Sequence, residues 1–139
     1  MSVRYDLVVI GGGPAGEKAA VAAAWFGRRV ALVEAAPTGP GGAMVHTGTL
    51  PSKTLRETAL YLSRHLGRAL YGEAAFDPSS RSARDLMCRL EEVTATQARQ
   101  IEQNLARHEV DLLHGFGRLV SANAVQVGDR RLDTDHILI

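Results

Sequence analysis

The stretch Gly11-Gly12-Gly13-Pro14-Ala15-Gly16 decides the fold because of what stands on either side of it. It directly follows the apolar run of residues 7–10 and opens a segment of small residues that continues to Ala24. The sequence therefore predicts a buried strand, a glycine-rich turn and a helix, one after another. This order is typical of a turn that receives a dinucleotide pyrophosphate, because backbone N–H groups and the positive end of the helix dipole face the phosphate charge.

The residues of the motif have separate roles in such a turn. Gly11 permits the tight turn, and Gly13 allows the backbone to approach the phosphates. Gly16 allows the helix to pack closely on the strand. Pro14 and Ala15 belong to the same turn, and we predict that they contribute to cofactor binding together with the glycines.

A second strand is predicted over residues 29–34, and it ends in an acid. Glu34 stands 18 residues after Gly16, close to where a carboxylate accepts hydrogen bonds from an adenosine ribose. The alternative is a glycine turn in an ordinary α/β protein, with Glu34 exposed to solvent. Strand, turn, helix, strand and acid all occur in the required order, however. We therefore predict that this end of the chain binds a dinucleotide.

The composition of the 139 residues indicates a globular protein and excludes other classes. Hydrophobic residues make up 45%, charged residues 22%, and the net charge is +1, which favours neither nucleic-acid binding nor an acidic tail. The single cysteine, Cys88, excludes an internal disulfide and is typical of a reducing compartment. The histidines have no metal-ligand spacing. No signal peptide precedes the first strand, and the longest mostly apolar stretch, residues 19–26, is too short to span a bilayer. We therefore expect a cytoplasmic protein that binds no membrane, nucleic acid or metal.

The remaining elements predict an α/β fold of the Rossmann-like, three-layer kind. A loop rich in proline and glycine is expected over residues 35–42, and a helix from Pro51 onward. A turn-rich segment over residues 72–82 precedes a long helix that is expected from Ser82 to His108. Short strands are predicted over residues 110–114, 116–120, 124–127 and 136–139. The last is apolar enough for a buried parallel strand.

A second motif occupies residues 41–53, which read GGAMVHTGTLPSK. With the glycine turn and Glu34, it resembles the FAD-binding N-terminus of the class I pyridine nucleotide-disulfide oxidoreductases. Members of that family commonly have two cysteines here, which form a redox disulfide beside the flavin. Met44 and Thr49 stand at these two positions. The other positions of the family motif are matched by Gly41, Gly42, Gly48, Pro51, Ser52 and Lys53.

Thr49 indicates a particular branch of the family. Residues 48–57 resemble the soluble, Si-specific NAD(P) transhydrogenases, as does Glu17 directly after the motif. The resemblance extends to residues 111–118 and covers nearly the whole chain. It implies FAD as cofactor, NAD(P)H as substrate, and hydride transfer without a redox disulfide. The alternatives are an NAD(P)H-dependent reductase of another small acceptor in the same fold, and a non-catalytic nucleotide-binding module.

The resemblance also implies a role for each motif residue. Lys53 would lie beside the reactive edge of the isoalloxazine ring with Thr49, and these two are the catalytic candidates. The loop of Gly41 and Gly42 would approach the FAD pyrophosphate, followed by Gly48. The cofactor-binding set is therefore Gly11, Gly13, Pro14, Ala15, Gly16, Glu34, Gly41, Gly42, Ala43, Gly48 and Lys53.

Two departures and one open position qualify this assignment. Ala43 replaces a threonine that helps to hold the pyrophosphate in many relatives. Met44 excludes dithiol chemistry within the chain, because a thioether forms no thiolate. His46 is either close to the flavin or a solvated or backbone-bonded residue.

Residues 1–139 would be the N-terminal part of an FAD/NAD(P)-binding domain. The NAD-binding and dimerisation domains of a homodimeric parent enzyme would then lie downstream or in a second chain, and the 139 residues alone would be inactive. The alternative is a complete small domain.

Overall fold

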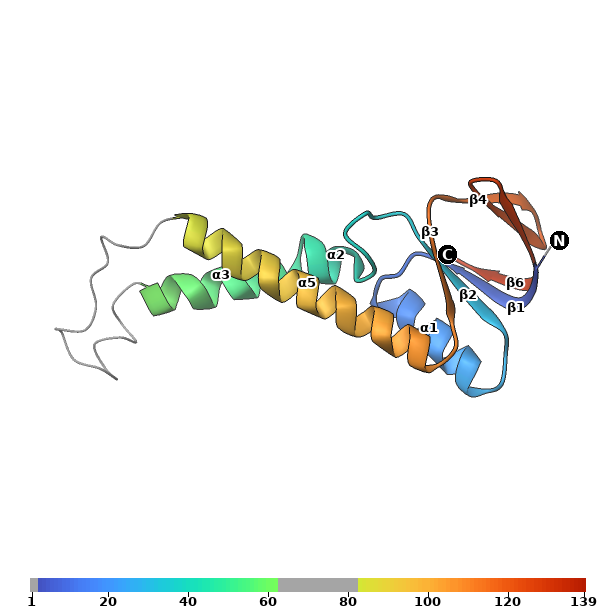
Figure 1. Cartoon of the computed structure of the whole chain (residues 1–139), viewed down its shortest axis with the longest axis horizontal. Coiled ribbons are helices and arrows are strands. Elements are labelled where there is room, and N and C mark those ends of the chain that lie inside the picture. The colour runs from blue at the N-terminus through green and yellow to red at the C-terminus, as the bar shows by residue number, and fades with distance from the viewer. Residues whose placement is uncertain (1–2, 63–82) are drawn as a thin grey trace.

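The computed structural model describes residues 3–62 and 83–139 and has the predicted α/β architecture. One sheet contains six strands in the order β3-β2-β1-β6-β5-β4, and helices cover one of its faces (Figure 1). The elements along the chain are β1 (Val3–Ile10), α1 (Pro14–Trp25), β2 (Val30–Glu34), α2 (Gly42–His46), α3 (Thr49–Leu62), α5 (Ala83–Arg107), β3 (Asp111–His114), β4 (Gly117–Ser121), β5 (Ala124–Val127) and β6 (Arg130–Leu138).

Four neighbouring strands of the sheet run parallel. β1 lies between β2 and β6, and β3 follows beyond β2. Ile10 at the end of β1 pairs with Val33 in β2, and Val9 pairs with Leu138 in β6. The carboxyl ends of these strands therefore meet at one edge, where open α/β sheets bind their ligands. The glycine motif and Glu34 both lie at this edge.

The first core lies between the sheet and the helices α1 and α5. It joins one face of β1 and β2 to small or branched side chains of the helices. Its buried members are Val9, Ala20, Val30, Leu32, Val45, Ile101, Leu105 and Val110. Because Val45 belongs to α2, this core also fixes the helix that carries the second sequence motif.

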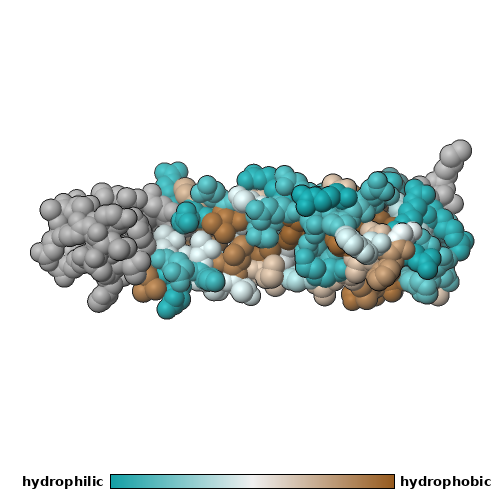
Figure 2. Space-filling model, turned by 90° about the horizontal axis from the view of Figure 1, so that it is seen from below, coloured by the Kyte–Doolittle hydropathy of each residue, from teal (hydrophilic) through white to brown (hydrophobic). Residues whose placement is uncertain are grey.

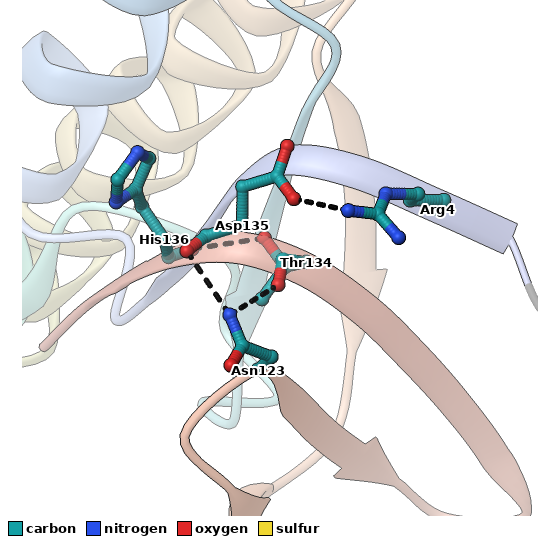
Figure 3. A network of polar contacts seen from close by, with 5 residues as sticks. All are labelled: Arg4, Asn123, Thr134, Asp135 and His136. Carbon is teal, nitrogen blue, oxygen red and sulfur yellow. Dashed lines mark hydrogen bonds and ion pairs between the residues drawn. The ribbon is translucent and has the colours of Figure 1, made fainter.

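The opposite face of β1 and β2 is covered by the hairpin of β4 and β5, which curls back from β6 as a third layer (Figure 1). The second core there consists of Tyr5, Val8, Ala31, Val33, Val125, Val127 and Leu132. Polar contacts hold the β4–β5 turn against β6 (Figure 3). The Asn123 side chain donates to the carbonyl oxygens of Thr134 and Asp135 at 3.1 and 3.3 Å, and Asp135 pairs with Arg4 of β1. These contacts attach β6 to the β4–β5 turn on one side and to β1 on the other.

Helices α3 and α5 run side by side and form an arm that extends away from the sheet (Figure 1). Hydrophobic surface is visible along this arm between hydrophilic side chains (Figure 2). The sheet-proximal end of α5 is buried through Ile101 and Leu105. Within the two described ranges, no helix is both long and apolar enough to cross a membrane.

Several element boundaries differ from the sequence-based expectations. The short helix α2 is not predicted, and α3 begins at Thr49, two residues before Pro51. β6 has nine residues and starts at Arg130, not at residue 136. The predicted parallel pairing of this strand is confirmed. The prediction that its end is buried is wrong, because the exposed fraction of Leu138 is 40%. The expected turns over residues 72–82 and the helix start at Ser82 lie outside the described residues.

Candidate functional site

The glycine turn has the backbone geometry that its motif predicts. Gly11 has φ +106°, a conformation that side-chain-bearing residues rarely adopt, and its N–H donates to the Val33 carbonyl at 2.8 Å. A Cβ on Gly16 would overlap the carbonyl oxygen of Gly11 and lie 3.2 Å from a methyl group of Val9. The tight turn at Gly11 and the close packing of α1 on the sheet at Gly16 thus both require glycine.

Gly13 stands in more open surroundings at the start of α1. A Cβ built on it would meet only the Cα of Gly42, at 4.0 Å, which is an ordinary contact. Its backbone is extended, with φ −70°, so the folded chain itself does not require glycine there. Pro14 and Ala15, which follow in the first turn of the helix, are both exposed. The space beside Gly13 is therefore free for a ligand that approaches the backbone.

Glu34 ends β2 with its carboxylate fixed beside the turn. Its side chain is buried, with an exposed fraction of 8%, yet it faces backbone donors. Oε2 accepts from the Gly12 N–H and Oε1 from the Ala36 N–H, both at 2.8 Å. A carboxylate offers about four acceptor positions, so each oxygen can accept one further hydrogen bond. Glu34 is thus held at the carboxyl edge with acceptor capacity left for a ribose.

Gly12 is a site residue that the sequence-based set omits. Besides its bond to Glu34, its carbonyl oxygen accepts the Gly41 N–H at 2.7 Å. A Cβ on Gly12 would lie 2.8 Å from Oε2 of Glu34 and 2.9 Å from the Cβ of Pro40. Its position in the glycine triplet is a signal that could have identified it. Gly12 joins the turn, the acid and the following loop.

The predicted loop after β2 ends at Gly41, one residue earlier than expected, and it returns to the glycine turn. Gly41 and Gly42 have φ +135° and +57°, and Gly41 precedes the first residue of α2. A Cβ on Gly42 would lie 3.0 Å from the Cα of Gly13. Ala43 follows, exposed, in the first turn of α2. Two glycine segments far apart in the sequence thus form one surface without side chains.

The catalytic candidates lie on the next helix and not on this surface. Thr49 is the first residue of α3 and Lys53 lies one turn later; both are exposed. Gly48 connects them to α2, because its N–H donates to the Ala43 carbonyl at 2.6 Å. The Gly48 carbonyl oxygen also accepts a hydrogen bond from the Ser52 hydroxyl at 2.7 Å. No hydrogen bond within residues 3–62 and 83–139 joins Thr49 or Lys53 to the glycine turn.

His46 and Met44 lie on α2, between the two parts of the site. Met44 has an exposed fraction of 36%. The Nε2 of His46 lies 3.0 Å from the Gly39 carbonyl oxygen and 3.3 Å from that of Pro40. This is the backbone-bonded arrangement that the sequence left open.

Glu17 is buried one turn into α1 and faces α5. Its Oε1 accepts from the Asn104 side-chain amide at 2.8 Å and from Lys18 at 3.3 Å. The exposed fraction of Glu17 is 7%. Asn104 is a contact that no sequence pattern indicates, because it lies 87 residues away on another helix. The contact links the helix of the glycine turn to α5.

Within the described ranges, the titratable groups outside this site do not form a second centre. Burial raises the pKa of the Tyr5 phenol, and its hydrogen bond to Asp111 acts in the same direction. Tyr5 lies near the beginning of β1, at the edge opposite the glycine turn. Among the residues that the structure describes, no group of three or more His, Cys, Asp or Glu side chains could hold a metal ion.

A comparison with protein families agrees with this geometry. The model of the pyridine nucleotide-disulphide oxidoreductases matches residues 5–139. The chain belongs to this family. The predicted family is thereby confirmed, and the match includes the glycine turn, Glu34 and the second motif.

Curated relatives carry the names of oxidoreductases. The soluble pyridine nucleotide transhydrogenase of Mycobacterium tuberculosis is 42% identical over 127 residues, which cover 91% of this chain and 27% of that protein. The dihydrolipoyl dehydrogenase of Acholeplasma laidlawii is 33% identical over 144 residues, or 100% of this chain and 41% of that protein. The predicted likeness to the transhydrogenase branch is confirmed. The chain spans only 27% of the length of the mycobacterial relative.

A solved structure shows the same fold. The HOCl-induced flavoprotein disulfide reductase RclA from Escherichia coli superimposes with a TM-score of 0.76 and 25% sequence identity. The superposition covers 96% of this chain and 27% of that protein. The three-layer α/β fold is therefore that of a flavoprotein segment, as the sequence predicts.

Proposed function

We propose that this chain is the FAD-binding portion of an oxidoreductase that transfers hydride between NAD(P)H and an acceptor. The observation that carries the proposal is the convergence at one sheet edge of the free space beside Gly13, the Gly41–Gly42 backbone and the anchored carboxylate of Glu34. A surface of backbone atoms next to a helix start fits a pyrophosphate. A fixed carboxylate beside it fits a ribose.

The residues present fit the adenosine diphosphate part of FAD. Gly11, Gly13, Pro14, Ala15 and Gly16 would face the pyrophosphate from the turn and the first turn of α1. The loop of Gly41, Gly42 and Ala43 would close over it from the other side. Glu34 would accept hydrogen bonds from the ribose hydroxyl groups. Because the backbone supplies these contacts, they need glycine at the points of close approach more than they need charged side chains.

The second half of the site would serve the flavin ring. When bound, FAD supplies a ring that accepts a hydride from a nicotinamide and returns it to an acceptor. Lys53, exposed on α3, would place a cation beside that ring and favour negative charge there. Thr49 and Gly48 would line the same end. Met44 and Thr49 cannot form a disulfide, so the chain itself offers no sulfur route for the electrons.

NAD(P) transhydrogenation is the particular reaction that we propose. Two features favour it over reduction of a disulfide. Thr49 stands where a second redox cysteine would be, and the 42% identical mycobacterial relative is named a soluble pyridine nucleotide transhydrogenase. Since the chain spans 27% of that relative, we propose that NAD(P)H binding, dimerisation and turnover require further segments or a second chain. The 139 residues alone would not turn over, and the assembled protein would act in the cytoplasm.

Replacing Glu34 tests the ribose assignment. Glu34→Ala is expected to weaken FAD binding by about 1–3 kcal/mol, because charge-assisted hydrogen bonds to the ribose are lost. Quenching of flavin fluorescence on titration with the protein gives the Kd. Glu92→Ala, at an exposed position on α5, is the matched control and should leave the Kd unchanged. Equal affinity of the Glu34→Ala and wild-type proteins would contradict the assignment.

Replacing Lys53 tests the flavin end of the site. Lys53→Ala is expected to lower the reduction potential of the bound flavin by about 30 mV, which is tenfold in the equilibrium of a two-electron couple, because a nearby cation stabilises the negative reduced ring. The potential is measured by spectroscopic redox titration. Arg56→Ala is the control, because Arg56 is an exposed cation on the same helix that pairs with Glu57 at 3.0 Å. A potential that shifts equally in both variants contradicts a specific role for Lys53.

A further inference from the structure

His46 connects α2 to the backbone of the loop that precedes this helix. Its Nε2 lies within hydrogen-bond distance of two consecutive carbonyl oxygens, those of Gly39 and Pro40, at 3.0 and 3.3 Å. A carbonyl oxygen only accepts hydrogen bonds, so the imidazole donates its Nε2–H to this pair. One half-buried side chain therefore holds two successive peptide groups of the loop.

The two carbonyls lie directly before the point at which the loop meets the glycine turn. The next residue, Gly41, donates its N–H to the Gly12 carbonyl at 2.7 Å. Gly39, Gly41 and Gly42 all have positive φ, between +57° and +135°. A segment with three such glycines has many alternative backbone conformations and loses much entropy when it is fixed. Its position against Gly13 therefore needs an anchor from outside the segment, and His46 provides a donor at the right place.

We propose that His46 is a positioning residue for the binding of a pyrophosphate-containing ligand. By holding the Gly39 and Pro40 carbonyls, it keeps Gly41 and Gly42 at the turn, where their backbone faces the free space beside Gly13. This inference rests on the proposed function for the class of ligand. His46 acts through the loop backbone and needs no contact with the flavin ring.

The hydrogen bond can be removed and restored by substitution. His46→Leu and His46→Met both replace the imidazole by an apolar side chain of similar size and so remove the donor. Two replacements of different shape separate the loss of the hydrogen bond from a packing defect caused by one of them. His46→Gln places an amide N–H near the position of the imidazole Nε2 and restores the donor. His108→Leu is the matched control. His108 is also half-buried, and its Nδ1 donates to the Asn104 carbonyl at 2.8 Å, but it lies directly after the last residue of α5.

Amide hydrogen exchange tests the anchor without any ligand. In the wild-type chain the Gly41 N–H is bonded to Gly12 and should exchange slowly. His46→Leu and His46→Met are expected to accelerate Gly41 exchange about tenfold, since one net hydrogen bond that holds the loop is lost. His46→Gln should retain most of the protection, and His108→Leu should leave Gly41 unchanged. Equal Gly41 exchange in wild-type, Leu and Met proteins would overturn the proposal.

Ligand affinity tests the consequence of the anchor, with FAD and ADP as the two probes. Both contain the pyrophosphate, so His46→Leu and His46→Met should weaken both by a similar factor of about tenfold. His46→Gln should restore both affinities to within a few-fold of the wild-type values, which a general loss of stability would not allow. Loss of affinity for FAD with unchanged affinity for ADP would place His46 at the flavin ring and overturn the proposal. If the wild-type chain bound neither probe, the proposed function would fail, while Gly41 exchange would still decide the positioning role.

Discussion

Gly13→Ala is expected to reduce FAD affinity at least about a hundredfold while the fold stays intact, because a methyl group would occupy the space where phosphate oxygens approach backbone N–H groups. The folded chain tolerates this methyl group. The added Cβ would meet only Gly42, at 4.0 Å, and the backbone of Gly13 has an ordinary extended conformation. We expect an unfolding free energy within about 1 kcal/mol of the wild-type value. Titration calorimetry with FAD and urea denaturation measure the two quantities. An FAD affinity equal to that of the wild-type protein would contradict the assignment of this turn to the pyrophosphate.

The same substitution three residues later, at Gly16, should destabilise the fold itself. Gly16→Ala is expected to lower the unfolding free energy by about 3 kcal/mol or more, because its Cβ would overlap the carbonyl oxygen of Gly11 and press on Val9. Backbone atoms cannot rotate away, so α1 must move off the sheet. Urea denaturation of the Gly13→Ala and Gly16→Ala proteins provides a matched pair, because both add one methyl group to the same motif. Equal stability of the two variants would contradict the close contact at Gly16.

The first β-α-β unit could be predicted from the sequence because its determinants are local. An apolar strand, a glycine turn, a small-residue helix and a terminal acid each leave a pattern within a few residues. The structure confirms the turn at Gly11, the tight packing at Gly16 and the placement of Glu34 at the same edge. The two N–H donors of the Glu34 carboxylate could not be predicted, since they depend on the exact path of the chain around Gly12 and Ala36.

The sequence does not predict the first half of β6, because charged residues obscure the alternation of buried and exposed positions there. Leu132 and Thr134 are buried, while Arg131 is exposed to solvent. This half pairs antiparallel with β5 on one side and parallel with β1 on the other. Only the apolar run after His136 has the composition of a buried strand. The sequence does not predict helix α2 either, because a helix of five residues is too short for a periodic pattern of apolar residues.

The contacts of His46 and Glu17 show where sequence patterns stop being informative about the site. His46 lies within the second motif and Glu17 directly follows the glycine motif, yet their partners are the carbonyls of a neighbouring loop and a side chain 87 residues away. The first contact depends on the path of the loop before α2, and the second on the packing of α1 against α5. A motif can therefore identify which residues belong to a site before it identifies what each of them holds.

The position of β1 in the middle of the sheet has a consequence for synthesis on the ribosome. β1 is the first strand to be made, but its neighbour on one side is the last, with Val3 opposite Leu132 and Val9 opposite Leu138. Contacts between such distant residues close slowly, since the intervening chain loses much entropy when they form. One edge of β1 therefore stays unpaired until almost all 139 residues have left the exit tunnel. During that interval the nascent chain exposes an apolar strand edge of the kind that chaperones protect.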